Sequence, residues 1–229
     1  MAEMALGYGS EYQLLRFLGH HREEFYDAIL HSIGNKDGDI IWLDYPYNSD
    51  RYSGDGELKG VDCFKKRDDY TIIEKQWKDY WPSGGNVMNW DGVFQLNGVW
   101  YFVEAKANKE EAYQKCRALS ADSCKFIDAA FEKTKEWLGV KNSIIWRDSK
   151  CYQLANRLSF MYFCNELCGI PAKLLYVGFI NGYPRKDVTS KEQWEEIWMD
   201  EYEKLGITEE QVEHLLFYVY PDCLPEDTK

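Results

Sequence analysis

The stretch NWDGVFQLNGVWYFVEAKAN (89–108) contains two apolar-rich runs that meet at Asn97-Gly98. Asn-Gly between two apolar runs is the strongest short signal for a β-hairpin with a two-residue type I′ turn. Counting outward from this turn places Asp91 directly opposite Glu104, and the period of two puts both side chains on one face, unless a bulge intervenes. The hairpin therefore predicts two acidic side chains side by side in a sheet.

Directly opposed side chains have Cβ atoms roughly 4.5–5.5 Å apart, so two carboxylates at such positions repel each other. Apolar neighbours along both runs imply burial, and a half-buried carboxylate pair should share a proton or bind a cation. Mg²⁺ accepts one or two carboxylates and keeps waters for a substrate. The same count places Asn89 opposite Lys106, one step further along the same face, where Lys106 can contact an anion that the cation holds. The alternative is an edge hairpin whose two acids reach solvent and pair with Lys106.

The composition is that of a globular protein with a real core. The chain has 229 residues, of which 45% are hydrophobic and 16% aromatic, and these values fit one large domain. No apolar run approaches the roughly 20 residues of a membrane span, and the first residues lack the features of a signal peptide. We therefore expect a cytoplasmic protein without membrane contact, in which the seven cysteines, which include no C-x-x-C pair, are reduced.

The formal net charge of −12 counts against an extended non-specific nucleic-acid binder, because phosphate neutralisation drives such binding. The basic residues form only small clusters. These are residues 65–67, Lys106 with Lys109, and Arg185-Lys186. Any nucleic-acid contact is thus expected to be local, and the sequence leaves the oligomeric state open.

The remaining periodicities predict helices and strands in the order helix, strand, hairpin, helices, strand. Helices are expected at residues 7–34, 126–139, 149–169 and 191–206, and a short one after Thr208. The first has Ser10 as N-cap and ends at Gly34-Asn35, and the fourth begins with a capping box of Ser190 and Gln193. The expected strands are 39–47, 172–180 and 216–222, residues 48–70 read as a loop, and 70–85 stay unassigned before a turn at Pro82 and Gly84-Gly85. The prediction is one α/β domain over 1–229 with a mixed sheet, a core at about 11–180, and a helical C-terminal extension, 181–229, packed on it.

In this hairpin, which follows a helix, Asp91 is separated by twelve residues from the sequence Glu-Ala-Lys. This pattern resembles the PD-(D/E)XK phosphodiesterase superfamily, which has the restriction-endonuclease-like fold. The resemblance covers about residues 11–180 as an order of elements, and Trp90 stands where the motif has proline. It implies a Mg²⁺- or Mn²⁺-dependent hydrolase that cleaves nucleic acid. In such an enzyme the metal polarises a phosphoryl oxygen and lowers the pKa of its water.

The resemblance also implies roles for the residues of the hairpin. Asp91 and Glu104 match the metal-binding carboxylates, the Ala105 carbonyl matches the backbone ligand, and Lys106 matches the catalytic lysine. The lysine would orient the nucleophile and offset charge in the transition state.

Two further positions come from helices. The family often adds a helix glutamate, for which Glu11 is the first choice and Glu24 the alternate, although a first-turn acid is also favoured by the helix dipole. Some branches carry a helical glutamine followed by an aromatic residue one turn later. Gln153 matches the glutamine, but Arg157 stands where tyrosine would be. We expect both to flank the pocket, with a carboxylate or a substrate phosphate as the partner of Arg157.

Two rival interpretations remain open at this stage. The chain could be a binding or regulatory module that kept the fold and lost turnover, which the acidic composition favours. It could also be a thiol enzyme, but no cysteine lies in a recognisable arrangement with histidine. The cysteines nearest to predicted helices are Cys116, Cys124 and Cys151. Aromatic residues before the hairpin could stack on bases or belong to the core. These are Trp77, Tyr80 and Trp81.

Overall fold

The computed structural model describes residues 9–35, 37–45, 58–82, 87–182 and 187–224. The glycines of the turn expected at 84–85, the first part of the loop expected at 48–70, the end of the strand expected at 39–47, and the pair 185–186 lie outside this part of the chain. The longer helices are α1 (Ser10–His20), α2 (Arg22–Ser32), α3 (Tyr70–Tyr80), α5 (Ala121–Leu138), α6 (Tyr152–Tyr162) and α7 (Lys191–Leu205). The shorter ones are α4 (Lys109–Ala112) and α8 (Glu209–Val212).

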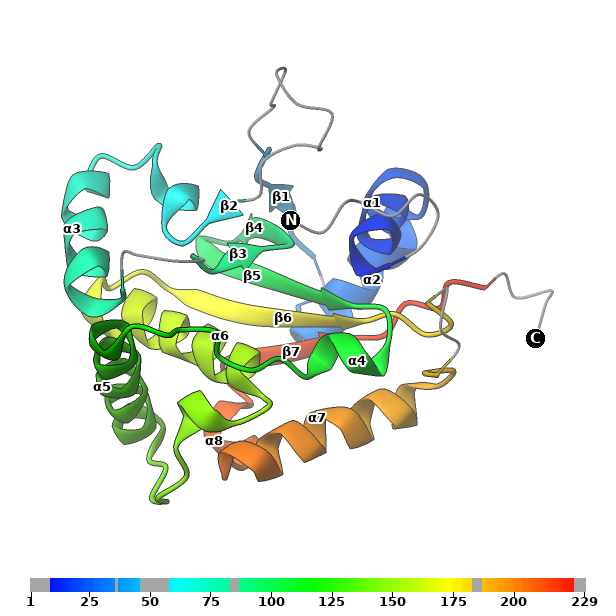
Figure 1. The fold of residues 1–229 in the computed structure, drawn as a ribbon. Helices are drawn as coiled ribbons and strands as arrows, with labels where there is room; N and C mark the ends of the chain where they lie inside the picture. The colour runs from blue at the N-terminus through cyan, green and yellow to red at the C-terminus, as the bar shows by residue number, and fades with distance from the viewer. Residues whose placement is uncertain (1–8, 36, 46–57, 83–86, 183–186, 225–229) are drawn as a thin grey trace.

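A mixed five-stranded sheet forms the centre of the protein, as the sequence predicts (Figure 1). Its order is β1-β4-β5-β6-β7, in which β4 runs antiparallel to both β1 and β5, and β5, β6 and β7 are parallel. The strands are β1 (Ile41–Trp42), β4 (Gly92–Leu96), β5 (Val99–Lys106), β6 (Ala172–Gly178) and β7 (Leu216–Val219), and β2 (Leu58–Lys59) pairs separately with β3 (Asn89–Trp90). The segment after residue 180 thus adds two helices and the edge strand β7.

Helices cover both faces of the sheet, and β5 sorts its side chains between them. Trp100 and Phe102 pack with the helices α3, α5, α6 and α7 in the larger core. Tyr101 and Val103, which alternate with them, pack with α1 and α2 in the smaller core. Glu104 follows the period of Phe102 and therefore faces the side of α6.

The hairpin has the turn and register that the sequence predicts. Asn97 and Gly98 both have positive φ, 52° and 79°, as a type I′ turn requires. Leu96 pairs with Val99, and the ladder continues without a bulge to Gly92 opposite Val103.

The outer part of the predicted register is wrong. Asn89 does not lie opposite Lys106, because β3 leaves the sheet and Asn89 pairs instead with Lys59 of β2. Asp91 forms a bend between β3 and β4. Trp90 explains the departure: its side chain is fully buried in the larger core and its indole N–H donates to the Gly60 carbonyl at 3.2 Å.

Three local predictions near the N-terminus also differ from the structure. The helix expected over 7–34 is broken at His21, whose φ and ψ of −126° and 39° are not helical. Ser10 does not cap it, because Gly9 precedes the first turn and no side chain accepts a hydrogen bond there. Among the described residues of the expected strand 39–47, Ile41–Trp42 form β1, and the Leu43 N–H adds one bond to the Val93 carbonyl at 2.9 Å. The unassigned segment after Asp69 forms α3.

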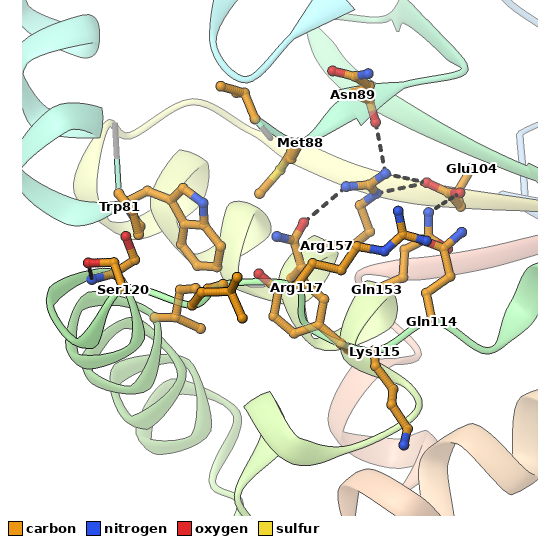
Figure 2. Close-up of a pocket in the computed structure, with 18 of the residues that line it drawn as sticks. Trp81, Met88, Asn89, Glu104, Gln114, Lys115, Arg117, Ser120, Gln153 and Arg157 are labelled. Carbon is orange, nitrogen blue, oxygen red and sulfur yellow. Dashed lines mark hydrogen bonds and ion pairs between the residues drawn. The ribbon is translucent and has the colours of Figure 1, made fainter. Parts of the chain in front are cut away.

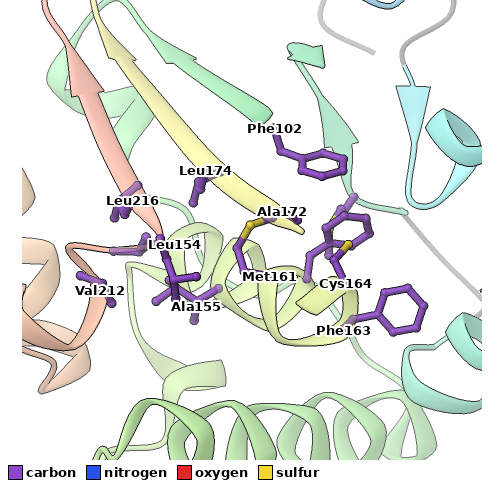
Figure 3. Packing of buried hydrophobic residues seen from close by; sticks show 14 of the residues in the cluster. Phe102, Leu154, Ala155, Met161, Phe163, Cys164, Ala172, Leu174, Val212 and Leu216 are labelled. Carbon is purple, nitrogen blue, oxygen red and sulfur yellow. The ribbon is translucent and has the colours of Figure 1, made fainter. Parts of the chain in front are cut away.

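Most predictions for the later part of the chain are confirmed. α5 ends at Gly139, which has the left-handed conformation of a C-terminal glycine. α6 is buried on nearly all sides between the sheet and α5 (Figure 3). Ser190 caps α7, Thr208 begins α8 with a capping box, and β7 closes the sheet. No helix in the described ranges combines the length and the apolar character needed to cross a membrane.

Candidate functional site

A cavity of about 760 Å³ lies between the hairpin, the start of α6 and the segment that leads into α5 (Figure 2). Asp91 and Glu104 both line it, so the two acids predicted to act together do face one space. Polar and charged residues gather around them. These are Asn89, Gln114, Lys115, Arg117, Gln153, Asn156 and Arg157.

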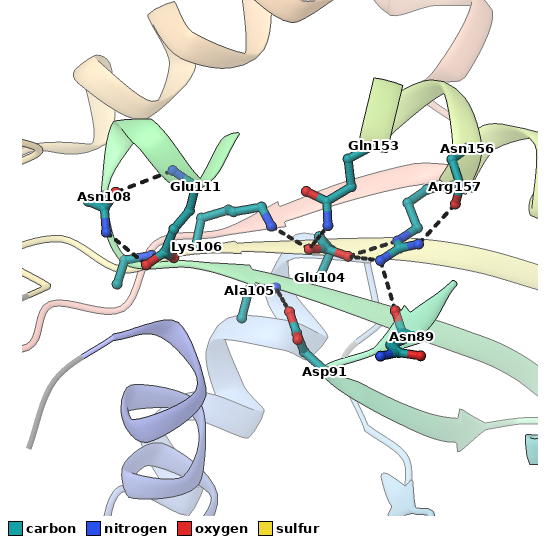
Figure 4. A network of polar contacts seen from close by, with 11 residues as sticks. Asn89, Asp91, Glu104, Ala105, Lys106, Asn108, Glu111, Gln153, Asn156 and Arg157 are labelled. Carbon is teal, nitrogen blue, oxygen red and sulfur yellow. Dashed lines mark hydrogen bonds and ion pairs between the residues drawn. The ribbon is translucent and has the colours of Figure 1, made fainter. Parts of the chain in front are cut away.

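Glu104 is the centre of a buried polar network (Figure 4). Its side chain is almost completely buried and accepts hydrogen bonds from Lys106, from the Gln153 amide at 2.6 Å and from Arg157 Nε at 2.8 Å. Burial alone would raise the pKa of Glu104, but the charges of Arg157 and Lys106 outweigh it and hold the pKa below its ordinary value. Glu104 is therefore ionised and neutralised by two cations.

Arg157 holds this network to the hairpin. Only 6% of the residue is exposed, and the guanidinium donates to the Asn89 carbonyl at 2.8 Å and to the Asn156 side chain at 2.9 Å. It also lies over the ring of Trp90, 4.6 Å from the centroid. The anionic partner expected for Arg157 is Glu104, which contacts its Nη2 at 2.7 Å.

Asp91 reaches the cavity from the bend between β3 and β4. Its Oδ2 accepts a hydrogen bond from the Ala105 N–H at 2.7 Å, which replaces the ladder partner that β4 no longer supplies. Burial, and after it the charge of Glu104, raises the pKa of Asp91 to about 7. At neutral pH this carboxyl is thus close to its midpoint, whereas Glu104 is fully ionised.

Ala105 follows Glu104 in the chain, and its backbone N–H donates to Asp91. The N–H and C=O of one strand residue point to the same edge of the strand. Because the Ala105 N–H points to Asp91, its carbonyl also leaves the ladder on the Asp91 side, where the sequence predicts a backbone ligand.

The end of β5 is fixed by a turn that the sequence analysis did not predict. Asn108 caps α4 by accepting from the Glu111 N–H, and Glu111 in turn accepts from the Ala107 N–H at 2.8 Å. Lys106, 4% exposed, donates to Glu104 and does not itself line the cavity, so its predicted contact with a substrate stays a prediction. Glu201 of α7 is another buried acid in this region, and burial raises its pKa well above the ordinary value although Lys106 counteracts the shift.

The structure does not bring the helix glutamates into the cavity. Glu11 lies exposed in the first turn of α1, and Glu24 lies exposed in α2, 3.9 Å from His21. Both helices pack on the sheet face opposite Glu104. Neither residue lines the cavity, and a role for either stays a prediction.

The sequence analysis did not predict that the segment between α4 and α5 contributes residues to the cavity lining. Gln114, Lys115 and Arg117 are exposed residues of this irregular segment, which shows no periodicity to read. Figure 2 shows the Arg117 side chain reaching toward the Glu104 end of the cavity, whereas the amino group of Lys115 points away from it. Arg117 thus adds to the cavity a positive charge that lies outside the basic clusters identified in the sequence.

The cavity region offers several oxygen atoms that could bind a hard cation, but not a full set of ligands. Gln153 Oε1 is buried beside Glu104 and has no hydrogen-bond partner within the described residues, a state that costs free energy unless a ligand satisfies it. The candidate donors are therefore the carboxylates of Asp91 and Glu104, the Ala105 carbonyl and this amide oxygen. No group of three or more His, Cys, Asp or Glu side chains suited to a metal occurs in the part of the chain that the structure describes.

Comparisons of the chain with protein-family models, with curated proteins and with solved structures gave no match.

Proposed function

We propose that the protein is a divalent-metal-dependent phosphodiesterase that acts on nucleic acid, with its site at the cavity beside Glu104. The observation that carries this proposal is that Asp91, in the bend just before β4, and Glu104, on β5, line one cavity with Arg117 and Arg157. Carboxylates suit a hard cation, and arginines suit a phosphate. The order of α1, β4, β5, α6 and β6 further supports a restriction-endonuclease-like fold.

The donor set fits Mg²⁺ or Mn²⁺, which, when bound, would polarise a phosphoryl oxygen and lower the pKa of its water. Gln153 Oε1 has no partner among the described residues, Asp91 Oδ1 and the Ala105 carbonyl complete the proposed donor set, and Glu104 supplies the charge. Gln153 fits this set because its buried amide oxygen otherwise lacks a partner.

Lys106 and Arg157 have different tasks in this account. Arg157 keeps Glu104 in place through Nε and Nη2 and is itself fixed by the Asn89 carbonyl. Lys106 bonds Glu104 and does not itself line the cavity. A divalent cation at Glu104 would compete for that carboxylate, and the ammonium group of Lys106 would then be free to turn toward the phosphate. One preorganised electrostatic contact of this kind is worth about 10²–10³ in rate.

A second candidate function is an anion-binding or regulatory module without turnover. The observation that favours it is the neutralisation of Glu104 by two buried cations, Lys106 and Arg157, which leaves less negative charge for a metal. Such a module would bind a phosphorylated ligand through Arg117 and would need no divalent cation.

Calorimetric titration with Mn²⁺ separates the two candidates. The wild type is expected to bind one Mn²⁺, and Asp91→Asn is expected to bind it at least about tenfold more weakly, because it removes a charged donor. Asp68→Asn is the matched control, since Asp68 is an exposed acid that does not line the cavity.

Equal Mn²⁺ affinity in Asp91→Asn and the wild type would contradict the proposed metal site. Absence of Mn²⁺ binding, together with metal-independent binding of an oligonucleotide, would favour the module. Thermal melts of both variants show whether the substitutions leave the fold intact.

A further inference from the structure

The cavity has two chemically different ends, and the proposed hydrolysis uses only one of them. Glu104 and Gln153 lie at the polar end, and Trp81 lies at the opposite end (Figure 2). Side chains of low polarity form much of the wall around Trp81. The cavity lining includes Pro82, Val87, Met88 and Ile127, as well as Tyr152, whose ring contacts the same Phe131 as Trp81 does.

The residues of the apolar end pack against the larger core. Trp81 stacks on Trp77 with ring centroids 5.8 Å apart and planes inclined by 13°, and it also contacts the ring of Phe131. Met88 and Ile127 are buried in the same core. Trp81 is only 4% exposed, so a small part of its ring meets the cavity. An apolar wall of this kind suits an aromatic ring system, which loses little conformational entropy on binding.

Arg117 provides a cation at the Glu104 end of the cavity (Figure 2). It is exposed, lines the cavity and has no hydrogen bond or ion pair with any residue in the described ranges. Most other arginines described here pair with an acid or a carbonyl, as Arg147 does with Asp128. In a chain of net charge −12, an arginine without such a partner at a cavity marks a place for an anion from outside.

We propose that the apolar end binds an unpaired nucleobase, so that the substrate is single-stranded nucleic acid, with Arg117 on its backbone phosphate. This inference rests on the proposed function for the cleavage step, but the binding it describes can be tested without cleavage. A base next to Trp81 and a phosphate next to Arg117 match the combination of aromatic platforms and positive groove that binds single strands.

The same features disfavour a duplex as the ligand. A paired base is stacked between its neighbours and must be flipped out before it can enter a pocket, a cost that a single strand does not bear. The net charge of −12 also opposes the broad phosphate contact through which proteins hold a duplex. The cavity, at about 760 Å³, lies in the size range of sites that enclose a small ligand, which fits one nucleotide of a strand.

The test fills the apolar end and measures binding. Ser123 lines the cavity from the first turn of α5, so Ser123→Trp places a large ring into it. Ala129→Trp is the matched control, because Ala129 is an exposed position of the same helix away from the cavity. The probes are a labelled single strand, the same strand with abasic positions, and its duplex. The strand is about ten nucleotides long, a length within the range of single-strand site sizes.

Fluorescence anisotropy, with Ca²⁺ and without metal, is expected to show that the wild type prefers the single strand to the duplex and to the abasic strand. Ser123→Trp should weaken single-strand binding at least about tenfold, the factor that corresponds to about 1.4 kcal/mol. Ala129→Trp should bind as the wild type does, and both variants should melt cooperatively.

Equal binding of single strand and duplex, equal binding of the abasic strand, or an unchanged affinity in Ser123→Trp would each overturn the inference. If the wild type cleaves duplex with Mg²⁺ and Ser123→Trp does so equally well, the inference fails while the proposed function stands. If the single strand binds as expected but no metal supports its cleavage, the proposed function fails while the assignment of the pocket stands. Failure of the wild type to bind the single strand under either condition also overturns the inference.

Discussion

Replacement of Arg157 by methionine tests how the site is held together. Methionine keeps an unbranched apolar stem over Trp90 but removes the guanidinium and all of its contacts. These are Nε and Nη2 to Glu104 at 2.8 and 2.7 Å, Nη2 to the Asn89 carbonyl at 2.8 Å, and Nη1 to Asn156 at 2.9 Å. Glu104 is then left buried with Lys106 and Gln153 as its remaining partners.

The expected loss in the free energy of unfolding is about 3 kcal/mol. Breaking a buried ion pair by removing one partner costs about 3–5 kcal/mol, because the other charge stays buried. Lys106 continues to compensate Glu104, which places Arg157→Met at the lower end of that range. A domain stable by about 5–15 kcal/mol remains folded after such a loss, so the variant can be measured.

Equilibrium unfolding in urea measures the effect, with Arg147→Met as control. Arg147 pairs with Asp128 at 2.8 Å, but both side chains are partly exposed, and such pairs contribute about 0–1 kcal/mol. The double variant Glu104→Gln/Arg157→Met should lose less than the sum of the single losses, since the two residues contact each other. If Arg157→Met costs no more than Arg147→Met, the description of Glu104 as an acid held by a buried arginine is wrong.

Two further predictions concern the acid and the cation at the cavity. In the folded protein the pKa of Asp91 is about 7, whereas an unfolded chain releases this proton near about 3.9. Between these two pH values the folded state therefore holds a proton that the unfolded state has lost. The stability that Asp91 contributes is fully present below about pH 4 and is lost as the pH rises to about 7. Urea unfolding from pH 4 to 8 should show the stability of the wild type falling relative to Asp91→Asn across this window and staying level above it; a constant difference would refute the shifted pKa. Arg117→Gln should lower the slope of log K against log salt for single-strand binding by about 0.7, the value for one phosphate contact, whereas Lys141→Gln, at an exposed position away from the cavity, should leave it unchanged. An unchanged slope in Arg117→Gln would show that this side chain contacts no phosphate.

The hairpin could be predicted because its signals are local. Asn97-Gly98 requires positive φ at both positions, and the period of two then sorts the residues of β5 between two cores. The spacing of Gln153 and Arg157, one turn apart on α6, likewise placed both at the pocket.

The errors arise where a tertiary contact decides the local structure. The burial of Trp90 draws Asn89 away from Lys106 and into a pair with β2, a strand that lies in a region without strand signals. The break at His21 has no clear periodic signature either. The capping turn after β5 does have a local signal, because Asn108 and Glu111 stand at the N-cap and N3 spacing, although the sequence analysis did not predict it. Arg117 belongs to an irregular segment, so only the fold shows that it faces the same space as Glu104.

The predicted roles of Asp91, Glu104 and Lys106 are tested most directly by Mg²⁺-dependent cleavage of single- and double-stranded DNA and RNA. The proteins compared are the wild type, Lys106→Met, and Lys135→Met as a control at a second buried lysine, which bonds Glu132 and the Ile144 carbonyl and has no contact with Glu104. The account predicts cleavage by the wild type that stops when the metal is chelated, a rate about 10²–10³ lower in Lys106→Met at an intact fold, and activity close to wild type in Lys135→Met. Undiminished cleavage by Lys106→Met, or no cleavage of any of these substrates by the wild type, would contradict it.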